Sequence, residues 1–141
     1  MRLSRKGAGL GAALFALTAM FTLAACSDSN APTVVNLAGN YNVTGIGQGA
    51  PGVPPVVQPI TGTAVLTATN YTIDIPPITT VSAGVYVALS DGTFTQDGTY
   101  TLGGGVPVPV QCAGTYTYVG NVLTIDTVCV GQRTITRFTR I

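Results

Sequence analysis

Two cysteines flank a tight-turn signal near the C-terminal end of this chain. Gly120-Asn121 separates two stretches, residues 112–119 and 122–129, whose alternating side chains are typical of β-strands. Folding the chain about this dipeptide places Cys112 opposite Cys129, at a non-hydrogen-bonded position where Cα atoms approach to about 4.5 Å. That separation lies at the near edge of the disulfide range. We therefore expect a Cys112–Cys129 disulfide, and the alternative is two buried thiols on one strand face.

The first 26 residues have the pattern of an export signal. Arg2, Arg5 and Lys6 precede an uncharged run over residues 7–25, which ends at Cys26. A retained transmembrane helix is the alternative, because an uncharged run of this length can span a bilayer. The ending Leu23-Ala24-Ala25-Cys26 resembles the lipobox of bacterial lipoproteins. That resemblance implies cleavage before Cys26 and acylation of its thiol and of the new amine.

The lipobox divides the chain into a signal peptide over residues 1–25, a lipidated tether over 26–37 and a folded domain over 38–141. An acylated Cys26 makes the membrane a partner, because two or three acyl chains anchor stably. Ser27 is similar to the sorting signal of enterobacterial lipoproteins that leave the inner membrane. It implies an outer membrane lipoprotein, on the periplasmic face or at the cell surface. Export also provides the oxidising compartment that a disulfide needs.

The folded domain has the composition of an all-β protein, rich in Thr, Val and Tyr. Residues 62–75 predict a second hairpin, with its turn near Thr69-Asn70. Residues 85–102 predict a third, in which Asp91-Gly92 forms the turn and Leu89 lies opposite Phe94. Another Asp-Gly pair at 97–98 is either a bulge or a rival turn and leaves the register of residues 93–102 open. With strands at 37–46 and 132–141, about eight strands are expected.

Long connections alternate with tight turns along this predicted chain of strands. Residues 47–59, 76–83 and 103–109 are rich in Pro and Gly, and each joins one predicted hairpin to the next. In an up-and-down meander, alternate connections lie at opposite ends. The long loops would then form one rim of a barrel, open like a cup, and the tight turns would close the other. The alternative is that these segments are tolerated insertions at loop tips.

This arrangement resembles the calycin barrels, the group that contains lipocalins and fatty-acid-binding proteins. Lipocalins carry Gly-x-Trp on the first strand and a basic residue on or after the last strand, which packs over that ring. Here Gly39-Asn40-Tyr41 lies on the first predicted strand, and Arg137 and Arg140 lie on the last. The resemblance implies that Tyr41, Arg137 and Arg140 close one end of an eight-stranded barrel. An immunoglobulin-like β-sandwich is the competing fold, because short strands and a disulfide fit it too.

An eight-stranded barrel is just wide enough to fill itself or to hold one small molecule. We expect a binding protein for a small apolar or aromatic molecule, in the barrel or at its mouth. The predicted inward-facing residues that would line the site are Tyr71, Ile73, Phe94, Tyr116, Tyr118, Leu123 and Ile125. The same residues could instead pack a solid core. The alternative function is a protein–protein module of the envelope, such as a protease inhibitor or a scaffold, acting through the loops or the tether.

The missing residue types exclude other classes of function. The chain has no His, Glu or Trp, and its one Lys lies at position 6. His-dependent catalysis, His-type metal sites and glutamate acid/base pairs are therefore excluded, and we expect no enzyme activity, no metal and no cofactor. From Cys26 onward three Arg stand against five Asp, a net charge of −2 (3 − 5). Without a basic patch, a nucleic-acid partner is not expected.

Overall fold

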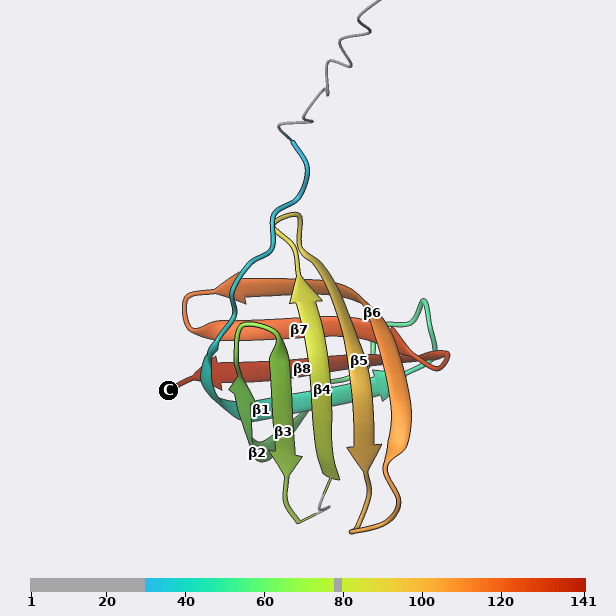
Figure 1. Ribbon diagram of the computed structural model, residues 1–141. Coiled ribbons are helices and arrows are strands. Elements are labelled where there is room, and N and C mark those ends of the chain that lie inside the picture. The colour runs from blue at the N-terminus through green and yellow to red at the C-terminus, as the bar shows by residue number, and fades with distance from the viewer. Residues whose placement is uncertain (1–29, 78–79) are drawn as a thin grey trace, which may run out of the picture.

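The computed structural model describes residues 30–77 and 80–141, which form eight antiparallel strands (Figure 1). The signal peptide, Cys26 and Ser27 lie outside these residues. The strands are β1 (Gly39–Gly49), β2 (Gln58–Leu66), β3 (Asn70–Ile75), β4 (Thr80–Ala88), β5 (Thr93–Thr101), β6 (Val108–Val119), β7 (Val122–Cys129) and β8 (Gln132–Arg140).

The sheet closes on itself. Each strand pairs with its neighbour in the chain, and β8 pairs back with β1 to complete the barrel. Figure 1 shows β7, β8 and β1 crossing behind β3, β4 and β5, while β6 curves from one set to the other. The up-and-down barrel predicted from sequence is therefore confirmed, and the immunoglobulin-like sandwich is wrong, because its two sheets would leave strand edges unpaired.

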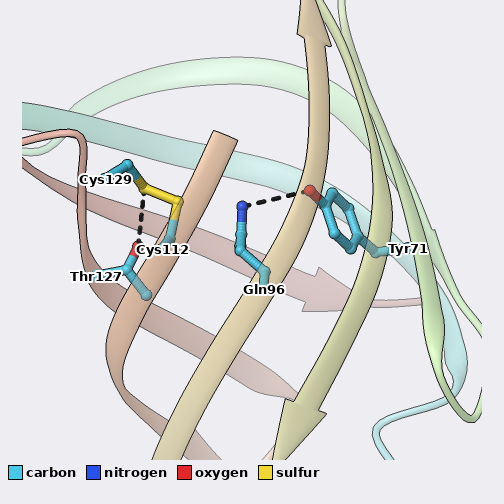
Figure 2. The surroundings of a disulfide bond; sticks show 5 residues. All are labelled: Tyr71, Gln96, Cys112, Thr127 and Cys129. Carbon is cyan, nitrogen blue, oxygen red and sulfur yellow. Dashed lines mark hydrogen bonds between the residues drawn. A yellow bond between two sulfur atoms is a disulfide. The ribbon is translucent and has the colours of Figure 1, made fainter. Parts of the chain in front are cut away.

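The β6–β7 hairpin has the predicted register. Val119 pairs with Val122 beside the Gly120-Asn121 turn, and Cys112 pairs with Cys129 at the far end. The two cysteines form the predicted disulfide, with Cα atoms 4.3 Å apart. Figure 2 shows the bond beside Thr127, on the inner side of these strands.

The β4–β5 hairpin corrects the sequence prediction by one residue. Phe94 lies opposite Ala88, not Leu89, and the Leu89 amide donates to the Thr93 carbonyl at 2.9 Å. The loop is three residues long, since Gly92 (φ 88°) takes the left-handed position after a turn and Asp91 accepts the Thr93 amide. An Asp-Gly pair fits this three-residue loop as well as a two-residue turn, so sequence alone misplaces the register.

The second Asp-Gly pair is neither a bulge nor a turn. Asp97 and Gly98 lie within β5, where Gly98 pairs with Gly84 of β4. A Cβ atom on either glycine would overlap main-chain atoms of the neighbouring strand. The Tyr71 hydroxyl also lies against Gly98. Gly98 is therefore required by the close packing of two strands and an inward tyrosine.

Aromatic side chains fill one half of the barrel. Tyr86 stacks on Phe94 with ring centroids 5.8 Å apart, and Tyr41 meets Phe138 edge-on at 6.3 Å. Tyr116 packs edge-on against Phe94. Phe138 and Tyr41 are almost fully buried. This half is the one closed by the tight turns between β2 and β3, β4 and β5, and β6 and β7.

The connections alternate between two ends, as predicted for a meander. The loops from β1 to β2, β3 to β4 and β5 to β6 share one end with the short β7–β8 turn, and we call this the loop end. The opposite end, which carries the tight turns, is called the turn end. Val130 in the β7–β8 turn has φ 49°, a strained conformation for a β-branched residue.

A short N-terminal segment crosses the turn end. Residues 33–37, which we call the strap, fall in the stretch assigned to the tether from sequence. The Val35 amide donates to the Ala88 carbonyl at 2.8 Å, and the Ser90 amide donates to the Thr33 carbonyl at 2.8 Å. Leu37 is buried against the core. The chain before the barrel is thus fixed to the β4–β5 turn at Thr33.

Candidate functional site

A hollow lies at the turn end, between the strap and the ends of β6 and β8. Its volume is about 340 Å³. We call it the turn-end hollow. Its wall combines three aromatic strand residues, a guanidinium and residues of a turn. The lining residues are Val35, Asn36, Leu37, Tyr41, Ser90, Gly92, Tyr116, Tyr118 and Arg140.

Arg140 ties the end of β8 to the start of β1. Its Nη2 donates to the Ala38 carbonyl at 3.0 Å, and its Nη1 lies 3.5 Å from the Tyr118 hydroxyl. The Tyr118 hydroxyl raises the pKa of the Arg140 guanidinium, which therefore stays charged. Two bonds hold the guanidinium at the edge of the hollow.

Three tyrosines surround the same space. The Tyr41 hydroxyl donates to the Leu37 carbonyl at 2.7 Å, and the Tyr116 hydroxyl donates to the Leu89 carbonyl at 2.9 Å. Burial raises the pKa of Tyr41, so its hydroxyl remains a donor at neutral pH. Tyr118 has 37% of its surface exposed. Its ring and hydroxyl are therefore accessible to a molecule that enters the hollow.

The predicted ligand-binding residues separate into two groups. Tyr116 and Tyr118 line the turn-end hollow. The others lie in the barrel interior, where Ile73 is half-buried and the rest are buried: Tyr71, Phe94, Leu123 and Ile125. Figure 2 shows Tyr71 facing Gln96 across the interior, with 3.5 Å between its hydroxyl and the amide nitrogen. Burial raises the pKa of this tyrosine as well.

The three residues predicted to close the barrel lie at two different places in the structure. Tyr41 and Arg140 meet at the turn end, as the calycin resemblance implies, although the aromatic partner packed on the Tyr41 ring is Phe138. Arg137 lies one residue before the inward Phe138, so its exposed side chain is on the outer face. Its strand neighbours are Gly45 and Thr124. Arg137 is separate from the hollow.

Sequence reasoning missed the strap and the β4–β5 turn as parts of this site. Val35, Asn36 and Leu37 come from a segment read as a tether, and Ser90 and Gly92 come from a turn. One signal was present, because Val34, Val35 and Leu37 are apolar within an otherwise polar stretch.

The outer wall carries an ion pair between β7 and β8. Arg133 donates from Nε to Asp126 Oδ1 at 2.9 Å and from Nη2 to Oδ2 at 2.6 Å. These hydrogen bonds hold the pKa of the Asp126 carboxyl below its ordinary value of 3.8. Because the folded-state pKa is the lower one, the carboxylate stabilises the fold above pH 3.8. This contribution is lost as the pH falls through the folded-state pKa.

Asp126→Asn is therefore expected to make the free energy of unfolding depend less on pH in the acidic range. Urea midpoints of the wild type and the variant should differ slightly at pH 7, because an exposed ion pair contributes little. The difference should vanish as the pH falls through the folded-state pKa of Asp126. A difference that stays constant from pH 7 to pH 2 would contradict this account.

The fold class of this protein is a closed eight-stranded antiparallel up-and-down barrel. This barrel is consistent with a lipocalin-like fold. Searches of protein-family models, curated proteins and solved structures find no match to this chain. Among residues 30–77 and 80–141, no group of three acidic, His or Cys side chains could hold a metal ion. That part of the chain also contains no helix long and apolar enough to cross a bilayer.

Proposed function

We propose that this chain is a lipid-anchored envelope lipoprotein of the lipocalin-like type, which binds a small apolar or aromatic molecule in the turn-end hollow. The observation that carries the proposal is the convergence of Tyr41, Tyr116 and Tyr118 on one hollow of about 340 Å³. This volume is near the lower end for ligand pockets. A hollow of this volume suits a ligand with one ring or two fused rings. Tyr118, which is 37% exposed, offers both an apolar face and a hydroxyl to such a ligand.

The anchor in this proposal is an acylated Cys26 in the outer membrane. Support comes from the lipobox-like ending at residues 23–26 and from Ser27. The seven residue steps from Cys26 to Thr33 span at most about 25 Å. Because Thr33 is hydrogen-bonded to Ser90, the turn end lies within about 25 Å of the bilayer surface. The hollow would face the membrane and the loop end would point away.

A neutral aromatic compound tests ligand binding. 2-Naphthamide, followed by its fluorescence anisotropy, is expected to bind saturably to the Cys26→Ser chain, which carries no acyl chains that could take up the compound. Tyr118→Ala should weaken binding about fivefold, because one aromatic contact contributes about 1 kcal/mol. Val65→Ala is the matched control, since Val65 is exposed on the outer wall and lies outside the hollow.

Each result of this titration separates the hypotheses. Saturable binding that Tyr118→Ala leaves unchanged would show that the ligand binds outside the hollow. No saturable binding at any concentration would overturn the small-molecule function and favour a surface role.

The second candidate function is a protein–protein module, a protease inhibitor or a scaffold, and the loop end favours it. Exposed valines stand on three of its connections, with Val53 61%, Val106 83% and Val130 85% exposed. Val130 also holds a strained backbone conformation, and such strain is often found at functional sites. An envelope partner would then bind at the end of the barrel far from the anchor.

A further inference from the structure

Arg140 has no acidic partner among the described residues. The ion pair found there joins Arg133 to Asp126. Asp91, in the turn next to the hollow, instead accepts the Thr93 amide at 2.9 Å. The guanidinium of Arg140 is therefore a positive charge that the described part of the barrel does not neutralise.

The guanidinium also has spare donors. An arginine carries five N–H groups. Arg140 uses one toward Ala38 and one toward Tyr118, which leaves three without an acceptor among the described residues. The bond to Ala38 holds the group in place, so the remaining donors point from a fixed position at the edge of the hollow. A neutral ligand does not need them.

The same hollow offers an apolar wall beside this charge. Leu37, Val35 and the ring of Tyr116 line it together with Arg140. A ligand that fits both features has an apolar body and one acidic group. Arginine binds carboxylate and phosphate oxygens through paired N–H groups in a planar fork.

We propose that Arg140 forms an anion subsite of the turn-end hollow, which takes the carboxylate or phosphate of an amphipathic ligand while the apolar body packs on Leu37 and Tyr116. This inference rests on the proposed function, because it uses the same hollow. It adds the chemical class of the ligand. The acidic group belongs either to a free amphipathic acid or to a lipid headgroup.

A pair of compounds that differ in charge tests the subsite. 2-Naphthoate is expected to bind the Cys26→Ser chain about threefold more tightly than the neutral 2-naphthamide, the ratio typical of an ion pair at a solvent-exposed guanidinium. Arg140→Gln should reduce this ratio to about one. Arg137→Gln is the matched control and should keep the ratio, because Arg137 lies on the outer face.

The outcomes distinguish this inference from the proposed function. Equal affinity for both compounds would overturn the anion subsite and leave the aromatic hollow intact. Failure of both compounds to bind would overturn the proposed function. Because Arg140→Gln also loses the bond to Ala38 and could loosen the strap, Arg140→Lys serves as a second variant. It should keep a preference for 2-naphthoate, and an equal loss in both variants would overturn the role of charge.

Vesicles identify the source of the acidic group. Displacement of 2-naphthoate by phosphatidylglycerol vesicles, but not by phosphatidylcholine vesicles, would assign the subsite to a lipid headgroup. Retained binding of 2-naphthoate in the presence of both would assign it to a free amphipathic acid. Displacement by both kinds of vesicle to the same extent would overturn recognition of the acidic group.

Discussion

Cys26→Ser is expected to leave this protein without acyl chains and at its full length, with residues 1–25 still attached. Serine has no thiol to acylate, and the proposed processing before residue 26 depends on that acylation. Immunoblotting measures the retained length of the variant, and mass spectrometry measures the loss of the acyl chains.

The other two cysteines provide the control for this result. Cys112 and Cys129 are joined in the barrel, so their joint replacement should leave the acylation and the cleavage of the chain unchanged. Mass spectrometry of the wild type should also show acyl chains on an N-terminal Cys26. If the wild type instead kept its full length and carried no acyl chain, residues 7–25 would be a retained transmembrane anchor.

The Cys112→Ala/Cys129→Ala variant is expected to lose about 3 kcal/mol of unfolding free energy, the loss predicted for a loop of about fifteen residues. The cysteines are 17 residues apart, and the bond limits the unfolded chain over that distance. A domain of this size has only about 5–15 kcal/mol of stability in total. Urea unfolding followed by tyrosine fluorescence measures the change.

Reduction of the wild type provides an independent check on this variant. With a reducing agent present, its urea midpoint should fall to about that of the double variant, and the variant itself should not respond. A double variant within about 0.5 kcal/mol of the oxidised wild type would show that the hairpin alone holds these strands together.

The accuracy of the sequence prediction differs between hairpins for a physical reason. For β6–β7, a Gly-Asn turn and two cysteines mark both ends, so one register satisfies both. For β4–β5, Asp91-Gly92 fits a loop of two or three residues, and no second marker resolves the choice. A slip of one residue moves every side chain to the other face, so such a marker decides which residues enter the core.

Four strand residues of the candidate site were predictable singly, but the site was not predictable as a unit. Tyr116 and Tyr118 were expected to contact ligand, and Tyr41 and Arg140 were expected to close the barrel. Closure of β8 onto β1 brings these four residues to one hollow. These residues are far apart in the chain, so no local periodic pattern in the sequence predicts that they come into contact. The contribution of the strap depends on Leu37 as well, the one fully buried side chain of that segment.

Closure of the barrel also limits how another protein can recognise this one. Every strand has a hydrogen-bonded neighbour on both sides, so the sheet has no free edge on which a foreign strand could be added. The same property protects against edge-to-edge aggregation, which matters for a domain whose outer wall is mainly threonine and valine. A partner must therefore recognise side chains on the wall or the loops, and any fibril of this protein would first require the β1–β8 seam to open.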